Sequence, residues 1–393
     1  MTAPTMTRPA NGRKTSAQGK AAPVQPRAFR VGVQSHDEIN YDQTVSTTAG
    51  TQDLPVLNIP PAGFLRGVYL VVEATTAGNA AAVTFAQDGP FIAIDSIVLE
   101  DVNSAPIIGP MNGYDLYCVD KYGGYSFQDD PKVSPTYTAV TGSGGTGGSF
   151  SFVLRLPVEL VNRDALGPLP NKSGTAMFKV RTRLSATATI YGTAPTAAPS
   201  VRVRMQQVDW WDPDESDMKG RPLAQNPPAV QTTQYWSKAP YAVNAGALRQ
   251  GLERVGYLIR NLIFILRDNA GSRTVGETNW PDPLILQFEA NILITRLRAV
   301  WRHEIIRHYD YSGFAQGGGT IDSGGSRDSG VYVEPFCLDF GLKPGAETRR
   351  GYLPTSPATR LEVQGTLGGA GTQTLTILTN DVAPAQDEAA LVV

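Results

Sequence analysis

His303, Glu304 and His308, in the stretch HEIIRH, come closest of all residues to an active-site pattern. In the zinc-protease signature H-E-x-x-H, two histidines four residues apart on a helix bind one zinc ion and the glutamate acts as general base. Here the histidines are five residues apart, so about 100° per residue places them about 140° apart around a helix. His36 is the only further histidine in the chain. The spacing therefore predicts that this stretch does not bind zinc.

The same stretch is better explained as an amphipathic helix within Thr295–Tyr309 that caps one end of a β-structure. Its polar face would carry Arg298, Arg302, His303, Glu304 and Arg307. Its core-facing stripe would carry Leu297, Val300, Trp301, Ile305, His308 and Tyr309.

Three further patterns offer weaker cases for chemistry. The Gly-rich run Gly142–Ser149 lacks the Lys-Ser/Thr of a phosphate loop and precedes a strand, which favours a flexible surface loop. The carboxylates of Asp212–Asp217 lack the EF-hand pattern, which favours a solvated linker over a weak calcium site. Carboxylate pairs such as Asp95 with Glu100, or Glu289 with Glu304, are expected in any β-sandwich of this size. We predict no catalytic residue, no metal and no cofactor.

The composition indicates an all-β protein with many turns. The 393 residues are 41% hydrophobic and include 40 Gly and 29 Pro, and this length suits two domains. The net charge of −2 gives no overall attraction for nucleic acid or for a membrane. Cys118 and Cys337 lie far apart among apolar residues, which favours buried free thiols over a disulfide.

The first 28 residues are predicted to form a flexible arm, because they are too polar to bury much surface. Before Asp37 the chain has no acidic residue, and its basic residues are Arg8, Arg13, Lys14, Lys20, Arg27 and Arg30. Such a segment suits an anionic surface such as lipid head groups or packaged nucleic acid, and a solubilising tail is the alternative. The chain has neither an apolar run of membrane length nor a signal-peptide pattern, so we expect assembly in the cytoplasm.

Strand-like runs occur twice along the chain in the same order, each time with one helix between strands. The first series is Phe64–Thr76, Pro90–Val102, a helix near Tyr114–Lys121, Ser149–Val161, Thr175–Gly192 and Pro199–Trp211. The second series is Arg254–Gly271, Asp282–Ile294, the helix within Thr295–Tyr309, Val333–Gly345 and Ala358–Val382. We therefore predict two tandem eight-stranded jelly-roll β-sandwiches, with short helices in the connections.

The polar, Pro-rich stretch after Trp211 is the best internal boundary. We predict an arm at 1–28, a first jelly roll at 29–211, a linker at 212–240 and a second jelly roll at 241–393. Large aromatic residues gather around the linker, namely Trp210, Trp211, Tyr235, Trp236 and Tyr241. They are candidate anchors of a subunit interface, and packing between the two rolls of one chain explains them equally well.

Taken together, these segments resemble the double jelly-roll major capsid proteins of tectivirus-type (PRD1-like) bacteriophages. GFLRGVYLVVEATT resembles the first strand of that family. Leu154–Leu184 resembles its proline-marked strand, its Asp-x-x-Gly loop and the strand that follows, and ERVGYLIRNLIFILRDNAG resembles the opening of its second roll. The resemblance extends over nearly the whole chain.

The resemblance implies a non-enzymatic structural protein of the virion. Three subunits would form a homotrimer whose six similar rolls imitate sixfold symmetry, and trimers would tile an icosahedral shell over an internal membrane. The basic arm would lie inside, near the lipids of that membrane. The implied partners are neighbouring trimers and penton, minor capsid and membrane proteins, without specific recognition of nucleic acid.

Two other classes of protein remain open at this point. A carbohydrate-binding or glycan-cleaving β-sandwich protein would also be rich in strands, although few cysteines and no signal-peptide pattern argue against an extracellular one. A viral spike or penton component would be expected to have a single roll without a duplicated body.

Overall fold

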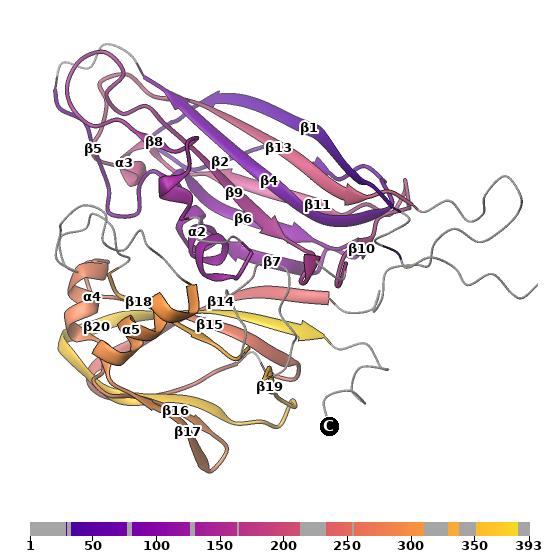
Figure 1. The fold of residues 1–393 in the computed structure, drawn as a ribbon. Helices are drawn as coiled ribbons and strands as arrows, with labels where there is room; N and C mark the ends of the chain where they lie inside the picture. Colours follow the sequence, from indigo (N-terminus) through magenta and orange to yellow (C-terminus); the bar gives the residue numbers. More distant parts are fainter. Residues whose placement is uncertain are drawn as a thin grey trace, which may run out of the picture.

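The computed structural model describes residues 29, 33–76, 81–125, 130–162, 165–212, 233–253, 255–309, 329–337 and 351–383. Most regular structure is β-strand, in two sandwiches that lie one above the other (Figure 1). The predicted arm at 1–28, Arg30 and residues 213–232 of the predicted linker lie outside the described residues. No helix in the described part of the chain is long and apolar enough to span a membrane.

One sheet of the first roll has the strand order β1–β13–β4–β9–β8. The strands are β1 (Ser35–Ser46), β4 (Phe64–Thr75), β8 (Thr138–Ala139), β9 (Phe150–Pro157) and β13 (Ser200–Trp210), with β10 (Leu169–Pro170) beside β4. Buried and more exposed residues alternate along β9, as expected for a strand with one face on a core. All the pairs in this sheet are antiparallel.

The second sheet of the first roll packs against the first across the core. Its strands are β2 (Gln52–Asp53), β3 (Leu57–Asn58), β6 (Ile94–Glu100), β7 (Pro106–Met111) and β11 (Lys179–Leu184). Shorter elements lie in the connections, namely β5 (Thr84–Phe85), β12 (Tyr191–Thr193), η1 (Phe91–Ala93), η2 (Pro131–Val133) and α3 (Thr187–Ile190). The short strands β5 and β12 pair with each other outside both sheets.

The second roll is built around two very long strands, β14 (Thr233–Gly251) and β20 (Leu361–Ala383). They pair along most of their length, and the pairing shifts between Asn244 and Gly246. On one side of this shift β20 pairs with β15, and on the other side it pairs with β16. The remaining strands are β15 (Leu258–Arg267), β16 (Leu284–Phe288), β17 (Asn291–Arg296), β18 (Val331–Pro335) and β19 (Leu353–Pro354).

Helices occupy matching places in the two rolls. In the first roll, α2 (Gly113–Tyr122) follows β7, and in the second, α5 (Arg298–Tyr309) follows β17. Asn112 begins α2 with a capping box, because its side chain accepts from the Asp115 N–H while the Asp115 carboxylate accepts from the Asn112 N–H. The second roll also contains α4 (Arg273–Asn279) between β15 and β16.

The predicted all-β fold and both helices after the second strand-like run are confirmed, whereas several strands differ from the predicted runs and β1 lies outside them. The run Asp282–Ile294, expected as one strand, is the hairpin β16–β17, which turns at Glu289 with a φ of 54°. The two final strands expected within Ala358–Val382 are one strand, β20. Strand β14 starts at Thr233, so residues 233–240 of the predicted linker form a strand.

Candidate functional site: the contact between the rolls and the open sheet edges

The stretch HEIIRH forms part of helix α5. Trp301 and Ile305 are buried as predicted, whereas His303 is exposed on α5. The side chain of His308 lies outside the described residues. Among the residues that the structure describes, no group of three or more His, Cys, Asp or Glu side chains is placed to hold a metal ion. The predicted core stripe is only partly correct, because Leu297 and Val300 are 54% and 44% exposed.

Arg302, assigned to the polar face of the helix by its spacing, is instead largely buried in an ion pair with Glu277 of α4. The Glu277 carboxylate also accepts from the Tyr332 hydroxyl at 2.6 Å and from the Gly330 N–H at 2.7 Å. The Arg302 guanidinium lies 4.3 Å from the centroid of the Tyr332 ring and donates to the Val331 carbonyl. These contacts join α4, α5 and β18, so the pair is part of the scaffold of the second roll.

The carboxylates considered as glycosidase pairs do not converge on a substrate site. Asp95 forms an ion pair with Arg183 at 2.5 Å, and Glu100 forms one with Arg181 at 2.8 Å. Glu289, at the turn of the β16–β17 hairpin, accepts from the Arg360 N–H at 3.1 Å. Asp95, Glu100 and Glu289 are thus each engaged by a cation or a backbone N–H.

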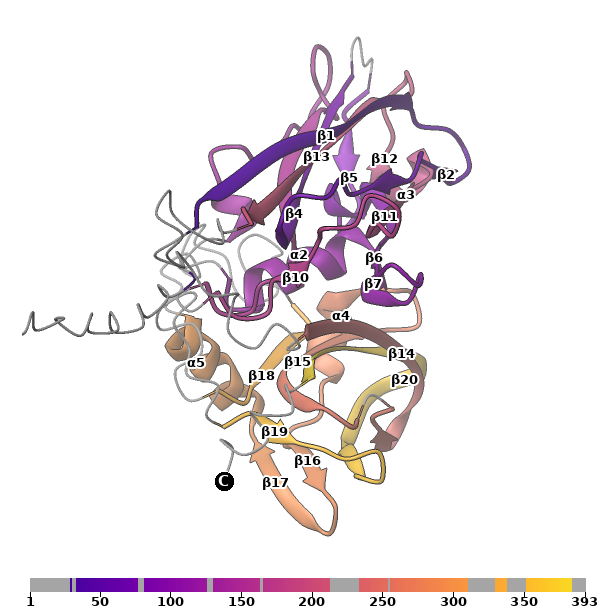
Figure 2. The same cartoon turned by 90° about the vertical axis from the view of Figure 1, so that its right-hand side faces the viewer.

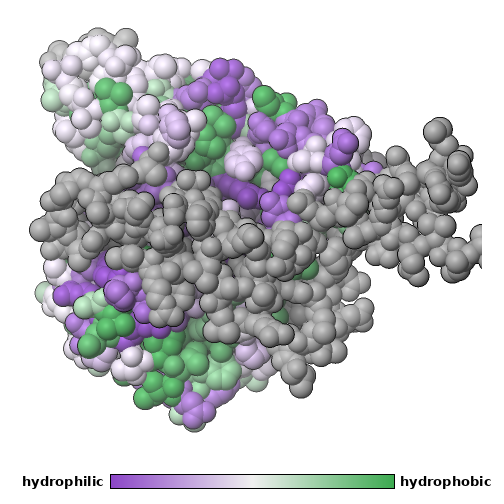
Figure 3. Space-filling view, viewed as in Figure 1, coloured by the Kyte–Doolittle hydropathy of each residue, from purple (hydrophilic) through white to green (hydrophobic). Residues whose placement is uncertain are grey.

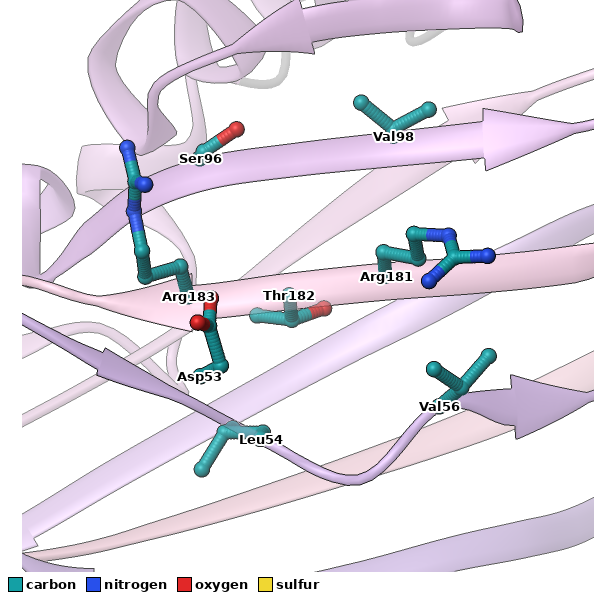
Figure 4. A pocket seen from close by; sticks show the side chains of 8 residues that line it. All are labelled: Asp53, Leu54, Val56, Ser96, Val98, Arg181, Thr182 and Arg183. Atoms are coloured by element: carbon teal, nitrogen blue, oxygen red, sulfur yellow. The ribbon is translucent and has the colours of Figure 1, made fainter. Parts of the chain in front are cut away.

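The two arginines that hold these carboxylates border a groove of about 360 Å³ on the second sheet of the first roll (Figure 4). Its lining is Asp53, Leu54, Val56, Ser96, Val98, Arg181, Thr182 and Arg183. The side chains come from β2, β6 and β11 and from the chain after β2, and Arg181 and Arg183 extend from the same strand. A shallow groove whose cations are already paired resembles a protein surface more than a catalytic pocket.

The aromatic residues around the linker have different environments. Trp210, Trp236 and Tyr241 are buried within the chain. Tyr235 is partly buried, and its ring lies 5.9 Å from that of Tyr257. Trp211 is 56% exposed, and its ring meets the edge of His36 at 5.0 Å. Among these five residues, Trp211 therefore presents the most surface to another molecule.

A buried cluster closes the base of the first roll. The Trp210 Nε1–H donates to Glu159 at 2.8 Å, Arg66 donates to the same carboxylate at 2.8 Å, and the Arg66 guanidinium lies 4.0 Å from the Trp210 ring. Phe29 packs against this tryptophan and Phe64 in edge-to-face contacts. Phe29 is thus fixed to the first roll immediately after the predicted arm. The basic residues of the arm lie outside the described residues.

The two rolls share one sheet. Strand β7 of the first roll and β14 of the second are joined as parallel neighbours, with Ile108 opposite Trp236. Their sheet therefore has twelve strands and passes from one roll to the other. The Trp236 Nε1–H donates to the Tyr125 hydroxyl at 2.7 Å, and this hydroxyl donates to Gln234 at 2.7 Å. Trp236 is thus an anchor between the rolls of one chain, which is one of the two roles expected of it.

Polar side chains of the second roll donate hydrogen bonds to carbonyl groups at the C-terminus of helix α2 in the first roll. Arg260 donates to the Gly123 carbonyl at 2.7 Å, and Asn261 donates to the Tyr122 carbonyl at 2.9 Å. A cation at a helix C-terminus satisfies carbonyl groups that have no partner within the helix and stabilises the negative end of the dipole. Both side chains are fully buried in β15. These contacts make α2 a structural part of both rolls.

A second ionic contact joins the rolls near their other end. Asp88 of the first roll forms ion pairs with Arg267 and Arg273 of the second, each at 2.7 Å. The Arg273 N–H also donates to the Gln87 side chain at 2.8 Å. Lys238 of β14 forms an ion pair with Asp115 of α2 at 2.5 Å. These interactions and the continuous sheet fix the orientation of the rolls relative to each other.

A bulge in the opening strand of each roll marks equivalent positions in the two rolls. In the first roll, β4 has a bulge at Arg66, where Asp209 pairs with Leu65 and Val208 with Gly67. In the second, β15 has a bulge at Arg260, where Asp381 pairs with Ile259 and Asn380 with Asn261. Arginine and aspartate thus occupy the same two positions in both rolls, and both aspartates are buried.

The sequence contains a signal for this equivalence that was not used. Each opening strand has an arginine inside an apolar run, in FLRGVYLVV and in YLIRNLIFIL. Burying an unpaired charge in such a run costs free energy. An arginine at this place in both opening strands therefore indicates that each roll supplies a buried partner for it.

Strands β1 and β17 each leave an edge open, at opposite ends of the molecule. Strand β1 is at one end of its sheet, and β17 is at one end of the twelve-stranded sheet. Figures 1 and 2 place β1 at the top and β17 at the bottom of the molecule. Ile39 on β1 is 64% exposed, and Ile292 and Leu293 on β17 are 64% and 43% exposed. Figure 3 shows hydrophobic surface at the bottom of the second roll, where Figure 1 places the β16–β17 hairpin.

Comparison with known proteins assigns the fold. No protein-family model and no curated protein matches the chain. Among solved structures, the MCP of Sulfolobus Turreted Icosahedral Virus (STIV) matches with a TM-score of 0.59 and 13% identity, over 92% of this chain and 100% of that chain. The major capsid protein of bacteriophage PM2 matches with a TM-score of 0.52 and 10% identity, over 90% and 98% of the two chains. The PBCV-1 virus capsid model matches with a TM-score of 0.53 and 10% identity, over 92% and 95%.

The chain therefore has the fold of the double jelly-roll major capsid proteins. The likeness extends over both rolls and over nearly the whole length of the matched chains. Its two rolls are the duplicated body that the sequence predicted.

Proposed function

We propose that this chain is the major capsid protein of a virus and has a structural, non-catalytic role. The main support is the match of the whole chain, both rolls included, to capsid proteins along 94–100% of the STIV chains. The described residues add no competing chemistry, since their candidate carboxylates are engaged by cations or backbone N–H groups. The carbohydrate-protein alternative rests on no observation of this kind.

In this proposal, three copies form a homotrimer of pseudo-hexagonal outline, as in the tectivirus-type capsids that the sequence resembles. Two equivalent rolls in each chain supply six similar bodies, and equal spacing of six bodies around an axis is what a flat hexagonal lattice requires. The trimers would tile an icosahedral shell of the virion, after assembly in the host cytoplasm. Neighbouring trimers, penton proteins and minor capsid proteins would be the partners.

The basic arm would face the interior of the shell, near the lipids of an internal membrane. Its cations, Arg8, Arg13, Lys14, Lys20, Arg27 and Arg30, suit an anionic surface and carry no pattern for reading a nucleic-acid sequence. We keep the division into an arm at 1–28 and a first roll at 29–211, and we propose that the second roll begins at Thr233. Phe29, packed on Phe64 and Trp210, would then mark where the arm leaves the first roll.

Light scattering on the purified full-length protein tests the trimer. The expected mass is three times 42.1 kDa. A monomer at every concentration, above all one that binds a glycan, would overturn the capsid proposal.

Deletion of residues 1–28 tests the arm. Trimers should persist, because the arm ends before the anchor Phe29, while binding to vesicles containing anionic lipid should be lost. A deletion variant that no longer forms trimers would show that the arm joins subunits instead.

A further inference from the structure

The contact between the two rolls of the chain suggests how one copy meets the next. Within the chain, β7 at the edge of the first roll lies beside β14 of the second roll. The equivalent edge of the second roll is β17, because β7 and β17 each pair with the preceding strand and each lead into a helix. The equivalent of β14 in the first roll is β1, because each is the first long strand and pairs with the last.

These two equivalent strands are the open edges described above. Among the strands that the structure describes, β17 pairs only with β16, and β1 pairs only with β13. An open edge exposes unpaired N–H and C=O groups and is a ready template for another strand. Since β1 and β17 lie at opposite ends of the molecule in both ribbon views, they cannot meet within one chain.

We propose that β17 of one copy packs beside β1 of a second copy and so repeats between chains the contact that β7 makes with β14 within the chain. This inference rests on the proposed function, because a head-to-tail contact of this kind closes into a ring when a few copies assemble. It names the surface and the partner that the trimer would use.

Both edges present exposed apolar residues together with charged residues. Strand β1 presents exposed Ile39 together with the exposed acids Asp37 and Glu38. Strand β17 presents exposed Ile292 and Leu293 and leads into the exposed Leu297 and Val300. Its cations, Arg296 and Arg298, lie at the end where β17 passes into α5.

Five of the eleven exposed large hydrophobic residues in the described part of the chain lie on or just after these edge strands. Ile292, Leu293, Leu297 and Val300 lie within one short segment of the second roll, and Ile39 lies on the edge of the first. Trp211, the most exposed of the aromatic residues around the linker, contacts His36 of β1. An exposed apolar group at a strand edge is a feature of surfaces that bind protein.

The internal equivalence also predicts the register of the contact. Trp236 of β14 corresponds to Asp37 of β1, since they pair with Asn380 and Val208, the residues beside the two equivalent aspartates. Ile108 of β7 is matched to Ile294 of β17, since each pairs with a buried leucine of the preceding strand, Leu99 or Leu286. Because Trp236 lies opposite Ile108, Asp37 of one copy should lie opposite Ile294 of the next, with the strands parallel.

Engineered cysteines test this register in the full chain, whose native Cys118 and Cys337 are buried. Neighbouring strands are about 4.8 Å apart, a distance that a disulfide can bridge. Mild oxidation of a double variant, Asp37→Cys with Ile294→Cys, should give covalently closed trimers on a non-reducing gel. A mixture of the two single variants should give covalent dimers, and each single variant alone should give none. The pair Val102→Cys with Ile294→Cys is the control, since Val102 is exposed on a turn far from β1 in the sequence.

A second measurement uses charge instead of a cross-link. Ile292→Glu and Ile39→Glu change side chains that are 64% exposed, so the monomer should fold as before. Each should shift trimer formation to concentrations at least about tenfold higher, because a charge is placed in an apolar contact. Val102→Glu should leave the association unchanged.

The outcomes separate this inference from the proposed function. A wild-type trimer that neither forms the cross-link nor responds to Ile292→Glu overturns the β17–β1 contact and leaves the capsid role standing. Covalent dimers from one single variant alone overturn it as well, because they indicate a twofold contact of like surfaces. A wild-type protein that stays monomeric overturns both.

Discussion

The two rolls reach the same jelly-roll fold with strands that are joined differently. In the first roll, the strands of the two sheets are separate elements, with β1 in one sheet and β2 and β3 in the other. In the second roll, β14 and β20 each serve both sheets without a break. Gly246 on β14 and Gly369 and Gly371 on β20 have positive φ angles near the place where the pairing shifts.

This difference shows where each roll can vary. A break between strands leaves room for added structure, and the first roll carries α3, β12 and β5 in such connections. A continuous strand that turns a corner needs a residue which accepts the unusual backbone angle, and glycine does so without a steric clash. The corner of the second roll is therefore constrained at Gly246, Gly369 and Gly371.

The rolls also differ in the place of their most buried ion pairs. Arg66 and Glu159 lie at the base of the first roll, with side chains 11% and 1% exposed. Arg302 and Glu277 join two helices to β18 in the second, with side chains 10% and 5% exposed. In both cases an aromatic residue adds a hydrogen bond to the glutamate, Trp210 in the first roll and Tyr332 in the second.

The largest effect should come from Glu277→Ala. Removing this carboxylate leaves Arg302 buried without its counter-charge and the Gly330 N–H without its acceptor. We expect a loss of about 3–5 kcal/mol in the free energy of unfolding, measured by denaturant titration. The matched change in the first roll, Glu159→Ala, should cost a comparable amount, since it removes the acceptor of Arg66 and of the Trp210 N–H. Near-neutral behaviour of both variants would show that neither ion pair supports its roll.

The alternating and apolar runs of the sequence predict the order of most strands, because such runs report burial on a sheet directly, but β1 and β14 lie outside the predicted runs. The sequence also located both helices, since their apolar spacing is local information. It did not reveal the ion pair of Arg302 with Glu277, because these residues are 25 positions apart and come together only through tertiary packing. Nor did it reveal that Trp210 and Trp236 are buried in one chain, since an aromatic residue is equally suited to a core and to an interface.

The next effect should be a dependence of stability on pH that belongs to the first roll. Burial, with smaller contributions from the nearby Glu38 and Asp37, raises the pKa of Asp209 to about 8, although Gln207 and Arg66 act in the opposite direction. A carboxyl whose pKa is higher in the folded state stabilises the fold below its unfolded pKa, and this contribution is lost as the pH rises toward 8.

Asp209→Asn should remove that pH dependence. Relative to the wild type, the variant should gain about 4 kcal/mol of stability when the pH rises from about 5 to about 9. Thermal unfolding at the two pH values measures the difference. Asp53→Asn, on an exposed strand, is the control and should leave the pH dependence as it is. Parallel curves for Asp209→Asn and the wild type would contradict the assignment.

A smaller effect is expected from Gly246→Ala in the second roll. No atom lies within 4 Å of the position that the new Cβ would take, so the cost comes from the backbone alone, at a φ of 103°. We expect a loss of about 1 kcal/mol, measured by denaturant titration. Gly251→Ala is a matched control on the same strand, because it also has open space and does not have a positive φ. Equal stabilities for the two variants would show that the change of register does not depend on Gly246.

The smallest effect should come from Asp42→Asn on β1. Asp42 pairs with Arg202 at 2.5 Å, but both side chains are nearly half exposed. Arg202 lowers the pKa of Asp42 by hydrogen bonding, so the pair should weaken as the pH falls through the titration of this carboxyl. Because water and salt screen an exposed pair, the change should be within the error of an unfolding titration near neutral pH. A clear loss of trimers without a loss of monomer stability would place Asp42 in the contact with β17. Assembly would then explain part of the charge pattern on β1, whereas the buried ion pairs of both rolls stabilise the folded chain.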